Sequence, residues 1–426
     1  MRSALLLLLL SPILLELHLH DAHAESSNRF DIQLSGDAFN TIGYVRQNTD
    51  VKTVNYEAMN RFRLTITPKF AADNGTTYGA RMRIRASMST GAIDADQAYL
   101  FTQGYFGQIE AGTQYDPAML YHVIAPSNFG TGGIDGDWAI GDAGWIQNQT
   151  TFLEPYPGGG YTVTTFVKGA NRLNYISPRF FSGGDPKLGL MGTVSYAPVN
   201  RKVFANVNRS AVNSDPTTSH PYGYGHTSAY SNCGGGGGPV GCNYRDVYEL
   251  GLRYDELVND MTVRAGLGYI NGSTGKTSFT IIQNFYNLSS WQAGLQLGAS
   301  GFLVGGSYAN AGRSSYPHAS AATGALFYED QYTWTAGISY ETGPVSVGFN
   351  YEYGHDAGDL TAPGARTANI FATGVTYILA PGLSTALEYL RSTTHNEARY
   401  TSDALGFGRT GSGNAHLVLW KTQVAF

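Results

Sequence analysis

The feature that most restricts the fold is a regular alternation of apolar and polar residues, which is clearest between residues 59 and 88. This stretch predicts two strands, 59–71 and 76–88, joined by a turn whose Asn74-Gly75 step is typical of hairpins. Side chains alternate across a strand, so the apolar and basic residues must lie on opposite faces. The apolar face holds Phe62, Leu64, Ile66, Phe70, Tyr78, Ala80, Met82 and Ile84, and the basic face holds Arg61, Arg63, Lys69, Arg81, Arg83 and Arg85.

The first 24 residues have the three parts of a secretory signal peptide: a basic start, a leucine-rich run and a small-residue cleavage site. An N-terminal membrane anchor is the alternative. However, Pro12, Glu16 and His18 interrupt the apolar run, which is too short for the ~20 apolar residues of a spanning helix. We therefore expect residues 1–24 to be a signal peptide and residues 25–426 to form the mature protein, without a transmembrane helix.

Alternating segments recur along the mature chain, and we count sixteen of them, separated in turn by seven tight turns and eight longer polar loops. This arrangement is typical of an outer-membrane barrel, whose outer face contacts lipid and whose inner face contacts water. Glycine is abundant, at 54 of 426 residues, and charged residues are only 14% of the chain, against about 25% in soluble domains. The predicted fold class is therefore all-β, a 16-stranded antiparallel transmembrane β-barrel.

A soluble sandwich of two packed sheets is the alternative fold, because its strands would also alternate. Against it, the second face of the strands carries glycine, serine, threonine and single charges over many consecutive strands, with few lysines. Such a face is expected to line a water-filled interior, which sixteen strands are wide enough to enclose. The sequence therefore favours the barrel.

Two long segments, 116–166 and 198–243, show no sustained alternation and are expected to be loops. The second contains Cys233 and Cys242, and a close cysteine pair in an exported protein predicts a disulfide. A metal site is the alternative, but two thiols are too few ligands, so we expect no metal.

No combination of residues marks a catalytic centre. The histidines lie mostly in loops, and His416, in the last strand, is more consistent with a side chain at the membrane interface. The glycine-rich run 130–133 is not followed by a predicted helix, so it does not indicate a phosphate-binding loop. We expect a protein that is not an enzyme, needs no cofactor and binds no nucleic acid.

Several strings of residues resemble the general diffusion porins of Gram-negative bacteria, most closely the alphaproteobacterial kind. They are residues 73–80 (DNGTTYGA), 94–101 (DADQAYLF) and 105–112 (YFGQIEAG), together with the terminal Phe426. The resemblance covers residues 62–115 and the last strand, and it implies a homotrimer in the outer membrane, surrounded by lipid and lipopolysaccharide. The set Val418, Trp420, Val424 and Phe426 resembles the family's signal to the barrel-assembly machinery.

The resemblance also implies that the third long loop, 116–166, folds into the lumen and narrows it. That loop would bring Asp135, Asp137, Asp142 and Glu154 opposite the basic face. Opposed charges across a narrow lumen orient dipolar solutes and set the ion preference. The alternative is that the basic residues only pair with inward-facing acids.

Two features depart from the family pattern. The second long loop, near residues 89–93, is too short for the latch that many members extend onto a neighbouring subunit, and the cysteine-containing loop is unusually long. The predicted function is passive diffusion of ions and small hydrophilic solutes. The alternatives are a structural or adhesive barrel with ligand-binding loops and a substrate-selective channel.

Overall fold

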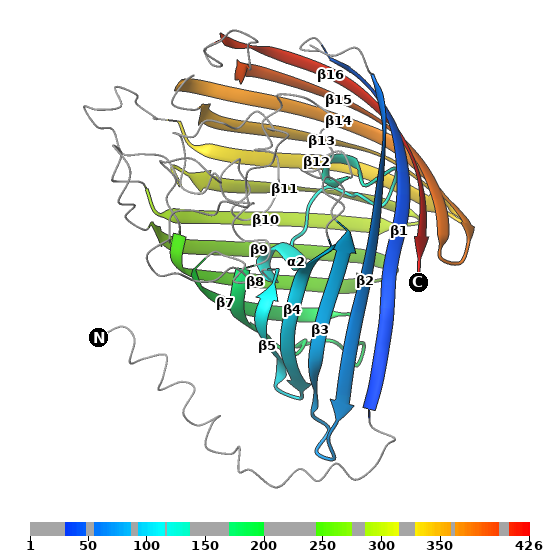
Figure 1. Ribbon diagram of the computed structural model, residues 1–426, viewed down its shortest axis with the longest axis vertical. Helices are drawn as coiled ribbons and strands as arrows, with labels where there is room; N and C mark the ends of the chain where they lie inside the picture. The colour runs from blue at the N-terminus through cyan, green and yellow to red at the C-terminus, as the bar shows by residue number, and fades with distance from the viewer. Residues whose placement is uncertain are drawn as a thin grey trace.

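The alternating segments of the sequence form sixteen antiparallel strands that close into one barrel (Figure 1). The computed structural model describes residues 30–47, 55–86, 93–115, 117–136, 170–199, 244–274, 286–314, 329–358, 363–399 and 409–426. Each strand pairs with its neighbours in the sequence, and β1 (Phe30–Gln47) pairs with β16 (Arg409–Ala425) to complete the ring. The predicted barrel is confirmed, and the sandwich alternative is wrong.

The fourteen remaining strands lie between these two in chain order. They are β2 (Tyr56–Ala71), β3 (Thr77–Ala86), β4 (Ile93–Gly104), β5 (Gly107–Gln114), β6 (Ala170–Ile176), β7 (Gly189–Val199), β8 (Tyr244–Val258), β9 (Met261–Thr274), β10 (Leu288–Ala299), β11 (Phe302–Gly312), β12 (Gln331–Thr342), β13 (Val345–Gly358), β14 (Pro363–Ala380) and β15 (Leu383–Arg399). At the tight turn between β2 and β3 the strand ends agree with the sequence prediction to within one residue, whereas some strands extend further than predicted toward the long loops. For example, β7 includes residues 198 and 199, which were predicted to begin a loop.

The hairpin of β2 and β3 has the turn that its sequence predicts. Gly75 adopts a φ of +80°, a conformation that glycine enters without steric cost, and its N–H donates to Ala72 O at 3.1 Å. Thr76 N–H donates to the Asn74 side chain at 3.0 Å. The register opposes Phe70 to Tyr78, so the apolar residues of both strands share one face.

That apolar face is exposed on the outside of the barrel, where leucine, isoleucine, valine and aromatic side chains recur on strand after strand. A continuous apolar surface of this extent is incompatible with water and is suited to lipid. Aromatic rings pack against one another toward both ends, as in the pairs Trp291–Tyr308 at 5.4 Å and Phe70–Tyr78 at 5.5 Å. His416 also lies on the outer face, 2.7 Å from the Tyr389 hydroxyl, as expected for an interfacial side chain.

Two short helices lie in the segment that follows β5: α2 (Pro117–Leu120) and the 3-10 helix η1 (Gly133–Asp135). In the described part of the chain, no helix has the length and apolar character needed to cross a membrane. The expected signal peptide (residues 1–24), the cysteines Cys233 and Cys242, and nearly all of the loop 198–243 lie outside the described residues.

Candidate pore constriction

Residues 117–136, here called the inserted loop, run along the inner wall of the barrel (Figure 1). Arg253 of β8 donates to His122 O at 3.0 Å, and Gln292 of β10 donates to Val123 O at 2.8 Å. Further contacts follow on β12, β13, β14 and β15. All of them are on the face opposite the exposed apolar residues. The inserted loop therefore crosses the interior of the ring, as predicted for the third long loop.

Glycines on β9, β10 and β13 allow the inserted loop to approach the wall closely. A Cβ atom at Gly294 would overlap Val123 O, and one at Gly266 would lie 2.8 Å from the Val123 side chain. A Cβ at Gly348 would likewise overlap the ring of Phe129. These three positions make the wall flat where the loop backbone lies against it, which explains why the inner face carries glycine there.

The far end of the inserted loop is held by Glu388 of β15 and Asn350 of β13. The Glu388 carboxylate accepts hydrogen bonds from Thr131 N at 2.9 Å, Thr131 Oγ1 at 2.9 Å and Gly133 N at 2.8 Å. Gly133 has a φ of +61°, so glycine suits this turn of the backbone around the carboxylate. Asn350 accepts from Ile134 N at 3.1 Å and donates to Pro126 O at 2.9 Å.

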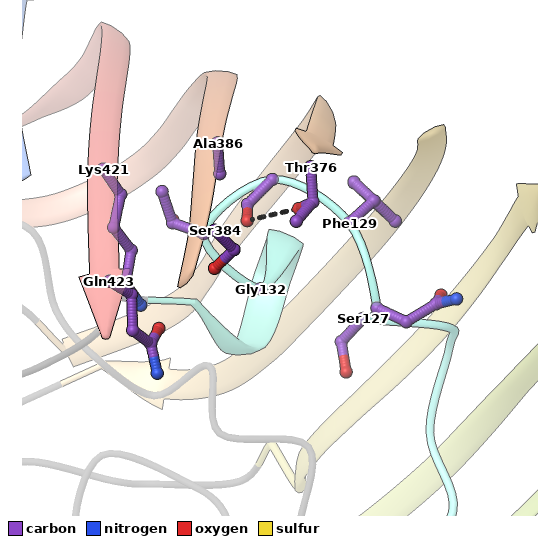
Figure 2. Close-up of a pocket in the computed structure, with 11 residues that line it drawn as sticks. Ser127, Phe129, Gly132, Thr376, Ser384, Ala386, Lys421 and Gln423 are labelled. Atoms are coloured by element: carbon purple, nitrogen blue, oxygen red, sulfur yellow. Dashed lines mark hydrogen bonds between the residues drawn. The ribbon is translucent and has the colours of Figure 1, made fainter. Parts of the chain in front are cut away.

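A small cavity separates this end of the inserted loop from strands β14 to β16 (Figure 2). Ser127 and Gly132 line it from the loop, and Ser384 and Gln423 line it from the wall. At its edge the Thr376 hydroxyl donates to Gly130 O at 3.0 Å. The loop is thus hydrogen-bonded to the wall at the edge of this cavity.

Part of the interior is packed with apolar side chains, which corrects the expectation of a uniformly polar inner face. Ile134 of η1 belongs to a buried cluster on the inner wall formed by Phe39, Met59, Ile370, Leu390, Leu417 and Leu419, with several alanines. The alternation in the sequence predicts only one apolar face for β16. Residues 417–420, however, are apolar on both faces, because lipid contacts one side and this cluster occupies the other.

The six predicted basic residues lie together on the inner faces of β2 and β3, where the register opposes Arg63 to Arg85. Arg61 and Arg63 both pair with Asp37 of β1, at 3.0 and 2.8 Å, and Lys69 pairs with Asp31 at 3.2 Å. These three residues therefore have the acidic partners that the alternative interpretation expected.

The other three basic residues, Arg81, Arg83 and Arg85, follow one another along the inner face of β3. The Arg83 guanidinium lies over the ring of Tyr115, 4.9 Å from its centroid, at the point where the chain leaves β5 for the inserted loop. The basic face therefore adjoins the start of the loop.

Of the predicted acidic residues, Asp135 lies in η1 and is exposed within the barrel. Asp137, Asp142 and Glu154 lie outside the described residues. The anchoring residues Glu388, Asn350 and Gln292 were missed by the sequence analysis. In the sequence, each of them is only a single acid or amide on an inner face made mostly of small residues. Such a pattern does not indicate which loop residue the side chain binds.

The proposed assembly residues Val418, Trp420, Val424 and Phe426 are all exposed on the outer face. The Phe426 backbone pairs with Gly36 of β1 in both directions, at 2.7 and 3.0 Å, and therefore takes part in closing the ring.

A closed barrel with an apolar outer surface and a loop fixed to its inner wall defines an outer-membrane channel. Residues 21–397 match the family model of the Gram-negative porins, and the chain belongs to this family. The protein is accordingly an outer-membrane porin that mediates passive diffusion, not an enzyme.

Solved structures agree with this fold. The chain is similar to OmpT of Vibrio cholerae in its trimer form, with 11% identity, a TM-score of 0.54 and coverage of 93% of this chain and 100% of that chain. The outer membrane channel DcaP of Acinetobacter baumannii is 12% identical, with a TM-score of 0.56 and coverage of 94% of this chain and 99% of that chain. OmpF of Salmonella typhi in complex with daunomycin is 12% identical, with a TM-score of 0.53 and coverage of 92% of this chain and 97% of that chain. No curated protein sequence matches the chain.

Proposed function

We propose that the porin is a general diffusion channel whose narrowest zone lies between the basic face and the third long loop. The observation that carries this proposal is the attachment of the inserted loop to the inner wall from β8 to β15. A loop held on that wall occupies part of the cross-section. Solutes then pass between the loop and the strands that carry the basic face.

Charges of opposite sign would face one another across this gap. Arg81, Arg83 and Arg85 supply permanent positive charges on β3. The acidic side is assigned to Asp135, Asp137, Asp142 and Glu154 of the third long loop. A field across a narrow, poorly screened passage orders dipolar solutes and tunes ion preference. Arg61, Arg63 and Lys69 belong to the same basic wall, although their acidic partners on β1 reduce their contribution.

The test is an Arg83→Glu variant, recorded in planar bilayers under a salt gradient. Reversing this charge should move the reversal potential toward cation preference. Arg391→Glu makes the same charge change on the outer side of β15 and should leave the reversal potential unchanged. If Arg83→Glu has the reversal potential of the wild type, Arg83 is not part of the constriction.

We further infer a homotrimer of the alphaproteobacterial type, embedded in lipid and lipopolysaccharide. The support is the resemblance of residues 62–115 to that kind of porin and the trimer form of OmpT, a protein with the same fold. Light scattering of the purified protein in detergent would give the number of subunits, and a monomer would contradict the inference. Liposome swelling with sugars of graded size would separate a general channel from a substrate-selective one or an adhesive barrel.

A further inference from the structure

Three arginines share one carboxylate on the inner wall beneath the inserted loop. Asp255 of β8 accepts from Arg253 at 2.7 Å and from Arg179, in the β6–β7 connection, at 2.9 Å. Arg264 of β9 lies 3.9 Å from the same carboxylate. Asp255 and Arg264 are opposite one another in the register, a few residues before and after the tight turn that joins β8 to β9. We call Arg179, Arg253 and Arg264 the arginine cluster.

The arginine cluster carries more positive charge than its partner neutralises. Elsewhere on the inner wall the buried Arg172 pairs with the carboxylate of Glu249, at 2.8 Å. In the described part of the chain, Asp255 is the only carboxylate within 4.0 Å of the arginine cluster. Two positive charges therefore remain, in a wall where burial weakens the screening by water.

The three guanidinium groups differ in how firmly they are held. Arg253 donates hydrogen bonds to Asp255 from two nitrogens, Nε and Nη2, and also donates to His122 O of the inserted loop. Arg179 donates to Gly189 O as well as to Asp255. Arg264 has only long contacts, to Asp255 and to Gln296 Oε1 at 3.4 Å, and its side chain is 41% exposed. Arg264 is therefore the group that a passing solute can reach.

The inserted loop places this cluster on the solute path. Gln296, which accepts from Arg264, donates to Ile124 O of the loop at 2.9 Å. The cluster thus lies directly on the tight-turn side of the loop, and in outer-membrane barrels the tight turns face the periplasm. A solute that has passed the loop meets Arg264 next.

We propose that the arginine cluster is a binding site for the oxyanion group of small solutes, a carboxylate or a phosphate, on the periplasmic side of the constriction. Guanidinium groups bind such oxygens with charge-assisted, often paired hydrogen bonds. Asp255 fixes Arg253 and Arg179 in place, and Arg264 contacts the anion. The proposal rests on the diffusion-channel function, because a solute reaches this site only through the lumen.

The test uses the complete protein in planar bilayers, with chloride and inorganic phosphate as probes. Arg264→Gln should lower the chloride-to-potassium permeability ratio by roughly tenfold, because loss of one unit charge about 6 Å away in water disfavours chloride and favours potassium by roughly threefold each. It should also raise the phosphate concentration that halves the chloride current by roughly threefold. Arg264→Lys keeps the charge and should retain the wild-type permeability ratio. Arg391→Gln removes an arginine from the outer side and should change neither value.

Equal behaviour of Arg264→Gln and the wild type in both measurements would overturn the site. An equal shift of either quantity in Arg264→Gln and Arg391→Gln would also overturn the site, because the effect would then depend on the total charge of the protein and not on the position of Arg264. In either case a wild-type channel that still conducts leaves the diffusion function intact. A wild-type protein without ion current would refute the channel function itself, and the site with it.

Discussion

The attachment of the inserted loop to Glu388 can be tested by removing one carboxylate. Glu388→Ala eliminates three hydrogen bonds from Thr131 and Gly133, all between 2.8 and 2.9 Å. A hydrogen bond to a charged group contributes roughly 1.5–3 kcal/mol, so the three together amount to roughly 4–9 kcal/mol. Water entering the vacated space would restore part of this. We therefore expect the docked state of the loop to lose about 3 kcal/mol.

A loss of about 3 kcal/mol raises the undocked population of the loop roughly a hundredfold. The effect should appear in single-channel recordings as excess current noise and as transient changes in conductance. The backbone ladders of β15 to β14 and β16 do not use this carboxylate, so thermal unfolding of the barrel should change little. The assay thus separates docking of the loop from stability of the barrel.

Glu388→Gln is the matched control, because it keeps the shape and one good acceptor oxygen but not the charge. Its current noise should lie between those of the wild type and Glu388→Ala. If the single-channel current noise of Glu388→Ala equals that of the wild type, Glu388 does not hold the inserted loop. A large loss of thermal stability in both variants would instead show that the carboxylate supports the barrel.

Two further predictions concern close packing and ring closure. Gly294→Ala should displace the inserted loop at a cost of roughly 1–3 kcal/mol and alter the conductance, because the new Cβ would overlap Val123 O. Gly192→Ala is the control and should leave the conductance unchanged, because the atom nearest to its Cβ would be 3.7 Å away. Equal conductance in the wild type and both variants would contradict the close packing of the loop at Gly294. Phe426→Ala should reduce the amount of porin in the outer membrane. The free energy of unfolding in detergent should change by less than about 1 kcal/mol, because the Phe426 ring is 57% exposed. Equal amounts of the wild type and the variant in the outer membrane would argue against an assembly signal at Phe426.

The barrel could be predicted from the sequence because the residue pattern of each strand depends on what its two faces contact. Lipid on one side and the lumen on the other impose a period of two, as Leu64 and Ile66 alternate with Arg63 and Thr65 on β2. Beyond the lipid this constraint disappears, so β7 continues to Val199, inside the segment 198–243 that was predicted to be a loop. The period indicates where a strand crosses the membrane, but not where it stops above it.

The candidate constriction could be predicted only in part. The basic face is local, because adjacent strands joined by a short turn must share it. The anchors of the inserted loop are not local: Glu388 and Asn350 meet residues more than 200 positions away, and their own strands give no indication of a partner. Leu417 and Leu419 were unexpected for the same reason, since the inner wall was taken to contact only water.

The pairing of β1 with β16 has a consequence for how the protein is made. These strands come from opposite ends of the chain, so until β16 arrives the sheet is open and has two edges of unpaired N–H and C=O groups. Such edges join with other chains in water and are costly in hydrocarbon. A polypeptide without β16 is therefore not a smaller channel but a template for aggregation. Productive folding therefore requires that β16 pair with β1 before either edge meets another chain.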